Sequence, residues 1–414
     1  MKRYKYVIIG GGVAAGFAAH EFAQQKVGPG QVAIITADSS LPYDRPPLSK
    51  SFLAGESSPE AILLEQAAFY RKQGIQVKTR TSVINPNLRK RILHCQPAGD
   101  IGFEKLLIAT GSEVRRLKLP GADLKGLYYL RLLRDAQALR QQIKTGKRAV
   151  VIGSGFIGME VASVLAKGGV ETTLIFPQDR VWSKLFTPEM SAWFQRYFEK
   201  RGVKLLAEKR VAALLGNKTV RAVGLVSGEV VPADFVVAGI GVVPATQLFE
   251  KTSLEIKDGV HVNEFLETNH PGVWAAGDVS NYPDKVFAKR RRLEHWDNAV
   301  EQGRCAVRNM MGKPQPFIHV PYFFSDLFDL SYEFWGDAEG ADDVVYRGKM
   351  DSGKFSVWWF RKERLVAAFV MSRPEEEREL APKWIMERTK INRKALLDGK
   401  RSLRSGKRED GKYV

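Results

Sequence analysis

The sequence has little cysteine and no long hydrophobic segment. Only two cysteines occur in 414 residues, Cys95 and Cys305, and no CxxC pair is present. This excludes a disulfide scaffold, a cysteine-rich metal site and a redox dithiol, and the six histidines lack the spacing of metal ligands. The apolar run 235–243 is shorter than the ~18 residues of a membrane-spanning helix. Any redox chemistry must therefore belong to a bound cofactor.

Length and composition are those of an ordinary globular protein. At roughly 150 residues per domain, the chain is long enough for two or three domains. The hydrophobic share of 44% and the charged share of 27% allow a large core and exclude disorder. The first residues lead directly into an apolar run, without the hydrophobic region of a secretory signal. We therefore expect a cytoplasmic protein without membrane contacts.

The charge is strongly basic. Lysine and arginine outnumber aspartate and glutamate by 64 to 46, which gives a net charge of +18. Such a balance favours acidic partners and makes nucleic acid a possible, less favoured one. Residues 388–414 contain ten basic and three acidic residues and little apolar periodicity, so we expect a mobile basic tail there.

The order of apolar runs and glycine turns predicts the fold. The run 6–9, three glycines, an alanine-rich helix to Gln25 and the run 32–36 form one βαβ unit, and the same order recurs over 149–176. The runs 106–109, 235–240 and 273–276 also end in glycine turns, as buried parallel strands do at a ligand crevice. The runs 355–360 and 365–371 predict an antiparallel hairpin. We expect an α/β protein with two Rossmann-like dinucleotide-binding domains and a small α+β C-terminal domain.

The first glycine motif has the form GxGxxA, with Gly10, Gly12 and Ala15 between a strand and a helix. The first glycine permits the tight turn, the second lets a pyrophosphate approach the backbone, and the small third residue lets helix and strand pack closely. Asp38 closes the next strand, where a carboxylate accepts hydrogen bonds from an adenosine ribose. The alternative is a glycine-rich turn that binds nothing.

A second motif, Gly153, Gly155 and Gly158, is a full GxGxxG in the same chain. Two fingerprints imply two dinucleotides. The simplest assignment is a resident flavin and an exchanging nicotinamide.

Eight motifs in order give the chain a family resemblance. They are YVIIGGGVAAG, LPYDRPPLSKSFL, LLIATGS, VVIGSGFIGMEVA, GIGVVPAT, VWAAGDVS, RRLEHWDNA and PYFFSDLFDLSYEFWGD. The chain resembles the FAD-dependent pyridine nucleotide oxidoreductases, in the branch of bacterial ferredoxin reductases, plant monodehydroascorbate reductase and apoptosis-inducing factor. The resemblance implies a glutathione-reductase-like fold, with FAD on the first fingerprint and NADH or NADPH on the second.

The resemblance also implies domain boundaries and a set of cofactor-binding residues. The expected parts are an FAD domain over 1–116 and 246–322, an NAD(P)H domain over 117–245, a C-terminal domain over 323–387 and the tail. Asp278 would meet the ribityl chain of the flavin, although it is alternatively a cap for the following segment. Further residues that the resemblance assigns to the cofactors are Ala14, Arg45, Pro46, Ala109, Thr110, Gly111, Arg131, Phe156, Ile157, Gly239, Ile240, Gly241, Gly277 and Glu294.

Two charged residues are expected to act together in catalysis. Glu160 lies inside an apolar helical pattern, and a buried charge needs a partner. In similar reductases an equivalent glutamate pairs with a lysine beside flavin N5, so the resemblance pairs Glu160 with Lys50. On the residues alone, the alternatives are that Glu160 is a first-turn acid that favours the helix dipole and that Arg45 and Lys50 lie in a solvated basic loop.

A helix over 298–311 is expected to direct its positive end at the flavin pyrimidine, where reduction places negative charge. His295 and Trp296 precede it and belong to the residues that the resemblance assigns to the cofactors, with a structural role as the alternative for His295. At the nicotinamide site, Gln178 stands where NADH-using relatives often carry a ribose-binding glutamate, and Arg180 follows two residues later. An uncharged residue discriminates less against a 2′-phosphate, and Arg180 could attract one, which leaves NADPH as the alternative. We favour NADH.

Without a dithiol, the flavin must pass electrons directly to an outside acceptor, and a one-electron carrier is favoured. Phe323 and Phe324 occupy an aromatic position near the flavin edge in the resembling family, or else they are core. Plant monodehydroascorbate reductase has an arginine and a tyrosine where this chain has Val300 and Phe324. We therefore rank a small acidic carrier such as a ferredoxin above the ascorbyl radical. The alternatives are a monodehydroascorbate reductase-like enzyme and a redox-sensing binding protein. We expect the protein to be a monomer or a homodimer.

Overall fold

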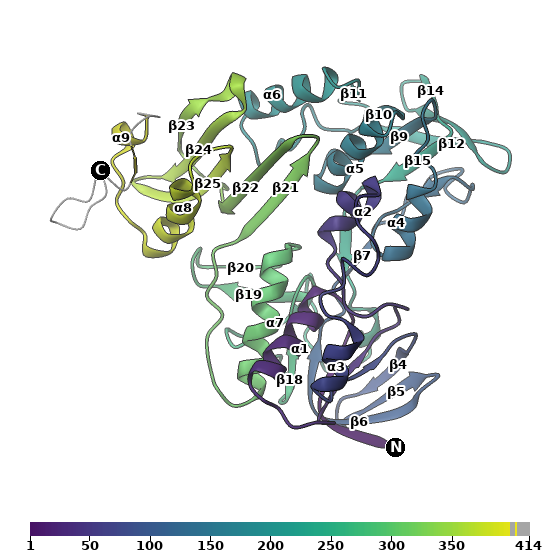
Figure 1. The fold of residues 1–414 in the computed structure, drawn as a ribbon, viewed down its shortest axis with the longest axis vertical. Helices are drawn as coiled ribbons and strands as arrows, with labels where there is room; N and C mark the ends of the chain where they lie inside the picture. Colours follow the sequence, from purple (N-terminus) through teal and green to yellow (C-terminus); the bar gives the residue numbers. More distant parts are fainter. Residues whose placement is uncertain (398–401, 404–414) are drawn as a thin grey trace. The chain divides into compact units, whose positions relative to one another are not determined.

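A computed structural model describes residues 1–397, 402 and 403 (Figure 1). The described residues form two compact units. Unit 1 comprises residues 1–46, 58–113 and 242–321, and unit 2 comprises 47–57, 114–241 and the described residues from 322 onward. No helix within these residues is long and apolar enough to cross a membrane. The four domain boundaries expected from the sequence stay predictions.

Unit 1 is built on a parallel sheet with an antiparallel extension. The strand order is β3-β2-β1-β6-β5-β4, and β18 pairs with β6. Ile9 lies beside both Ile35 and Ile108, so these strands end at one edge of the sheet. The strands are β1 (Lys2–Ile9), β2 (Val32–Ile35), β3 (Gln76–Lys78), β4 (Ser82–Asn87), β5 (Ile92–Gln96), β6 (Gly99–Ile108) and β18 (Val273–Ala275). Shorter strands are β7 (Ser112–Val114), β16 (Val242–Pro244), β17 (Val260–His261), β19 (Ser280–Asp284) and β20 (Lys289–Arg291).

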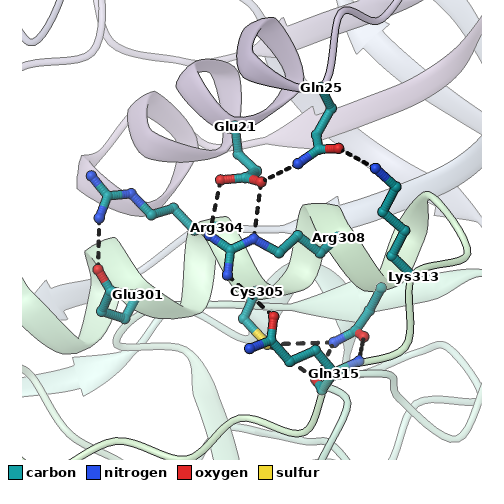
Figure 2. A network of polar contacts seen from close by, with 9 residues as sticks. Glu21, Gln25, Glu301, Arg304, Cys305, Arg308, Lys313 and Gln315 are labelled. Carbon is teal, nitrogen blue, oxygen red and sulfur yellow. Dashed lines mark hydrogen bonds and ion pairs between the residues drawn. The ribbon is translucent and has the colours of Figure 1, made fainter.

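Helices α1 (Val13–Gln24) and α7 (Trp296–Met310) pack closely in unit 1, which also contains α3 (Ala67–Lys72). Their approach requires glycine at position 303, because a Cβ there would lie 2.5 Å from the carbonyl oxygen of Ala14. A polar network ties the two helices together (Figure 2). At its centre the buried Glu21 accepts hydrogen bonds from Arg308 at 2.9 and 3.2 Å and from Gln25 at 2.8 Å.

Unit 2 contains a second parallel sheet, in the order β11-β10-β9-β15-β8. Its strands are β8 (Leu127–Tyr128), β9 (Arg148–Ile152), β10 (Glu171–Ile175), β11 (Lys204–Leu206) and β15 (Phe235–Ala238). Strands β12 (Val211–Gly216), β13 (Val220–Leu225) and β14 (Val230–Pro232) form a small antiparallel sheet. The helices are α2 (Ser51–Ala54), α4 (Leu133–Arg140), α5 (Phe156–Lys167) and α6 (Pro188–Glu199). The two predicted βαβ units are thus confirmed.

The C-terminal part of unit 2 is an antiparallel sheet of order β21-β22-β25-β24-β23. The predicted hairpin is confirmed as β24 (Lys354–Arg361) and β25 (Arg364–Met371). The other elements are β21 (Tyr322–Leu327), β22 (Leu330–Gly336), β23 (Asp343–Lys349), α8 (Glu375–Glu387) and α9 (Arg393–Leu397).

Part of the predicted basic tail is described. Leu396 is buried, its carbonyl oxygen accepts a hydrogen bond from Arg347 at 3.0 Å, and Arg393 forms an ion pair with Asp343 at 2.5 Å. Residues 398–401 and 404–414, on which the rest of that prediction falls, lie outside the described residues.

Candidate functional site

The first glycine motif forms the turn between β1 and α1. Gly10 has φ +116°, and a Cβ there would lie 2.1 Å from the carbonyl oxygen of Ala109, so only glycine fits. Gly12 caps the N-terminus of α1 without a side-chain hydrogen bond. A Cβ on Gly12 would lie 3.4 Å from the guanidinium of Arg45. A cation and the positive end of a helix therefore converge on this turn, which is a suitable environment for a pyrophosphate.

Asp38 follows β2 at the same edge of the sheet. Its Oδ2 accepts a hydrogen bond from the hydroxyl of Tyr43 at 2.9 Å, and its Oδ1 accepts one from the backbone N–H of Ser40 at 3.4 Å. These bonds fix the orientation of the carboxylate next to the glycine turn. It retains acceptor capacity for sugar hydroxyls.

A second group of polar atoms gathers where β6 and β18 end. Ala275 lies beside Ile108 in the sheet, so Thr110 and Asp278 leave neighbouring strands. Ser112 donates a hydrogen bond to Asp278 Oδ2 at 2.6 Å, and Thr110 donates one to the carbonyl oxygen of Ala245 at 2.8 Å. Ser112, from the chain segment after β6, thereby holds the loop after β18 in place.

The N-terminus of α7 is anchored in unit 1. Trp296 Nε1 donates a hydrogen bond to Asp44 at 2.7 Å, and Glu294 pairs with Arg292 at 2.7 Å. Burial lowers the pKa of His295 to about 4, so this side chain is neutral at physiological pH. The side-chain nitrogen of Asn298 is buried and has no hydrogen-bond partner within the described residues. A donor of this kind suits a polar ligand group.

The second glycine motif forms the turn between β9 and α5 in unit 2. Gly153 has φ +106°, and a Cβ there would lie 2.4 Å from the carbonyl oxygen of Gly239. A Cβ on Gly158 would lie 1.9 Å from the carbonyl oxygen of Gly153. Gly155, in contrast, caps α5 and faces open space, with nothing within 4 Å of a Cβ. The outer glycines therefore permit packing, and the middle one leaves room for a ligand.

The loops around this turn come from the neighbouring strands. Gly239, Ile240 and Gly241 follow β15, whose Ala238 lies beside Ile152 at the end of β9. The carbonyl oxygen of Gln178, after β10, accepts a hydrogen bond from Glu208 N–H at 2.9 Å. Arg131 precedes α4, and its N–H donates to Asp135 at 3.2 Å.

Lys50 and Glu160 come together in unit 2, with 3.6 Å between Nζ and Oε1. The Glu160 carboxylate also accepts hydrogen bonds from Ser49 at 2.5 Å and Ser325 at 2.7 Å. Burial raises the pKa of Glu160, against the opposing effects of Lys50 and the two serine hydroxyls. The Lys50 ammonium lies still closer to Asp326, at 3.0 Å.

Sequence reasoning missed Ser49, Ser325 and Asp326 as partners in this cluster. Asp326 lies on β21, far along the chain from Lys50, so no local spacing links the two. The available signal was a carboxylate between aromatic residues in FFSDLF.

Phe324 also borders this cluster, because the Lys50 ammonium lies 4.2 Å from its ring centroid. Phe323 stacks on Phe334 at 4.9 Å between ring centroids and contacts Phe156 at 4.6 Å. Val300 is buried in α7 of unit 1. The side chains of Val300 and Phe324 are both apolar.

The predicted residues thus form two sets. Unit 1 contains Gly10, Gly12, Ala14, Ala15, Asp38, Arg45, Pro46, Ala109, Thr110, Gly111, Gly277, Asp278, Glu294, His295 and Trp296. Unit 2 contains Lys50, Arg131, Gly153, Gly155, Phe156, Ile157, Gly158, Glu160, Gln178, Gly239, Ile240, Gly241 and Phe324. In the part of the chain that the structure describes, no cluster of side chains could hold a metal ion.

Two family models match the chain. The family described as pyridine nucleotide-disulphide oxidoreductase matches residues 4–303, and the one described as reductase C-terminal matches residues 322–406. The chain is 36% identical to peroxisomal monodehydroascorbate reductase 4 of Arabidopsis thaliana over 402 residues, covering 92% of this chain and 82% of that protein. It is 35% identical to monodehydroascorbate reductase of Solanum lycopersicum, covering 92% and 94%.

Solved structures give the same fold. The covalent putidaredoxin reductase–putidaredoxin complex matches with a TM-score of 0.91 at 29% identity, covering 96% of both chains. A ferredoxin reductase for the CYP199A2 system from Rhodopseudomonas palustris matches with a TM-score of 0.90 at 29% identity, covering 95% of this chain and 97% of that one.

Proposed function

Since this chain belongs to the pyridine nucleotide-disulphide oxidoreductase family, we propose that it passes single electrons to a small acidic iron–sulfur protein of the ferredoxin type. The protein is an NAD(P)H-dependent flavoprotein reductase with FAD as its cofactor. FAD held by these residues would supply a group that takes up a hydride and releases the two electrons one at a time. Each NADH therefore reduces two carrier molecules and yields NAD⁺ and one proton.

We assign FAD to the glycine turn of unit 1 and the nicotinamide nucleotide to that of unit 2. The unit 1 turn, with Gly10, the α1 N-terminus and Arg45, suits a pyrophosphate, and Asp38 and Asp278 suit sugar hydroxyls. Gly155 leaves the corresponding space in unit 2. The buried Asn298 amide in unit 1 suits a polar cofactor edge.

Direct transfer from the flavin follows from the state of the cysteines. Cys95 and Cys305 are both free and buried. Burial raises the pKa of both thiols, that of Cys305 to about 11, so neither is a reactive thiolate at physiological pH. No dithiol relay is therefore available between the flavin and the acceptor.

The choice of acceptor depends on the apolar side chains at positions 300 and 324. A site for the ascorbyl radical needs polar donors, which Val300 and Phe324 do not supply. The net charge of +18 favours encounter with an acidic protein. Similarity to putidaredoxin reductase in complex with putidaredoxin supports the same choice. Monodehydroascorbate reductase activity is the second candidate, favoured by the 36% identity to the Arabidopsis thaliana enzyme.

Anaerobic stopped-flow mixing distinguishes the two candidates. The protein is first reduced with NADH and then mixed separately with an acidic [2Fe–2S] ferredoxin, with ascorbyl radical and with a two-electron quinone. We expect the ferredoxin to be reduced fastest, with a rate that falls as salt screens the opposite charges. Faster reduction of the radical, or reoxidation by the quinone alone, would contradict the proposal.

A variant and its control sharpen this comparison. Phe324→Tyr adds a hydroxyl and should accelerate reduction of the ascorbyl radical while leaving ferredoxin reduction unchanged. Phe334→Tyr is the matched control, because it adds the same hydroxyl on the neighbouring strand β22. Equal effects of both variants on the radical would argue against a role for position 324.

A further inference from the structure

The segment after β10 carries an acid–arginine pair where Rossmann folds recognise an adenosine ribose. We propose that Asp179 gives this protein its preference for NADH over NADPH, because it holds Arg180 and repels a 2′-phosphate. The inference rests on the assignment of the nicotinamide nucleotide to the second glycine motif. It does not depend on which protein accepts the electrons.

The guanidinium of Arg180 is already engaged by its own segment. Nη1 lies 2.6 Å from Asp179 Oδ2, and Nη2 donates a hydrogen bond to the carbonyl oxygen of Ser183 at 3.1 Å. The remaining nitrogen, Nε, is buried and has no hydrogen-bond partner within the described residues. Arg180 is therefore oriented toward its own chain and is not presented as a phosphate-binding fork.

A second cation near this segment, Lys209, is paired as well. Lys209 follows β11, and its N–H donates a hydrogen bond to the carbonyl oxygen of Phe176 at 3.1 Å, which places it beside the end of β10. The Lys209 ammonium lies 3.5 Å from Glu229. Neither Arg180 nor Lys209 is thus left as an uncompensated positive charge.

Two acidic residues also lie near this segment. Glu208 lies beside Gln178 through its N–H bond to the Gln178 carbonyl oxygen. Glu189 has a pKa lowered mainly by a hydrogen bond from its own backbone and also by the charge of Arg180. A 2′-phosphate, which brings about two negative charges, is repelled by Asp179 together with these carboxylates.

Asp179 is also suited to bind the ribose of NADH. Its side chain is 60% exposed, and Oδ2 is the oxygen that binds Arg180. Oδ1 remains available to accept a hydrogen bond from a ribose hydroxyl. Asp179 then performs the role of the glutamate that Gln178 replaces, from the next position in the chain.

The test is the reductive half-reaction alone, followed as anaerobic bleaching of the FAD-loaded protein with NADH or NADPH and no acceptor. For the wild-type protein, the maximal bleaching rate divided by the half-saturating nucleotide concentration should be higher with NADH than with NADPH. Asp179→Asn should shift this ratio toward NADPH by about tenfold or more, as expected for gaining a charge-assisted hydrogen bond. This shift should arise mainly from changes in the half-saturating concentrations of the two nucleotides. Asp179→Asn combined with Arg180→Gln should lose the gain for NADPH.

Asp329→Asn is the matched control. It changes the net charge equally and also breaks an exposed aspartate–arginine pair, with Arg201 at 2.8 Å, elsewhere in unit 2. Its NADH to NADPH ratio should equal that of wild type. A preference of wild type for NADPH, an unchanged ratio in Asp179→Asn or an equal shift in Asp329→Asn would overturn the inference. Loss of ferredoxin reduction with the nucleotide preference intact would instead refute only the proposed acceptor.

Discussion

Replacing Lys50 by methionine should destabilise unit 2 in a pH-dependent manner. The change removes the ammonium that lies 3.6 Å from the buried Glu160 carboxylate and leaves Asp326 as a neighbouring negative charge. Removing one partner of a buried ion pair typically costs about 3–5 kcal/mol. Protonation of Glu160 limits this loss, so we expect about 3 kcal/mol at pH 8 and less at pH 5.

The direction of the pH effect follows from the raised pKa of Glu160. The stability that a group with a raised folded-state pKa contributes is fully present below its unfolded value, here 4.5, and declines as pH rises through the folded value. Lys50 and the serine hydroxyls oppose the rise, which burial causes. Without Lys50 the pKa rises further, so the penalty at neutral and alkaline pH increases.

Thermal unfolding of the FAD-loaded protein between pH 5 and pH 8 measures this effect. Glu160→Gln in combination with Lys50→Met should recover much of the loss, because no buried charge remains. Lys167→Met, which breaks the exposed pair with Glu56 at 3.9 Å, is the control and should change stability by less than about 1 kcal/mol. A Lys50→Met penalty that is independent of pH and of Glu160→Gln would refute the reasoning.

Two further substitutions test the glycine turn of unit 2 and the helix pair of unit 1. Gly153→Ala should destabilise unit 2 by roughly 1–3 kcal/mol through its positive φ, whereas Gly155→Ala should keep the melting temperature and weaken only NADH binding in a titration. Arg308→Met should lower the melting temperature at pH 7, because Glu21 is buried, while Lys313→Met on the surface should not. Burial tends to raise the pKa of Glu21, but hydrogen bonds from Arg308 and Gln25 leave it lowered. The stability that Glu21 contributes is therefore present above pH 4.5 and is lost as the pH falls. The loss of stability in Arg308→Met should consequently become smaller toward pH 4. A loss that is constant with pH would contradict this account.

The sequence predicted those strands and helices that depend on patterns among a few neighbouring residues. The apolar runs before Gly10 and Gly153 are β1 and β9, and the helices after them are α1 and α5. Periodicity and glycine chemistry act over a few residues, so these elements can be recognised without knowledge of the fold. The hairpin of β24 and β25 was equally local, because a charged turn separates two apolar runs.

The composition of the cluster around Lys50 and Glu160 could not be predicted in the same way. Lys50, Glu160 and Asp326 come from three distant parts of the chain, and their distances depend on the packing of α5 against β21. The likeness to other reductases suggested Lys50 with Glu160, but not that Asp326 lies closer to the ammonium. The Asp179–Arg180 ion pair could likewise not be predicted from the sequence, because neighbouring residues of opposite charge bind each other only when the backbone brings their side chains together.

The most direct test of the account is an anaerobic titration of the purified protein with NADH, followed by the visible absorption of the flavin. The account predicts a yellow protein whose colour is lost as one NADH is added per bound FAD and returns when oxidised ferredoxin is mixed in. A protein that stays colourless after incubation with FAD, or a bound flavin that neither NADH nor NADPH bleaches, would contradict it.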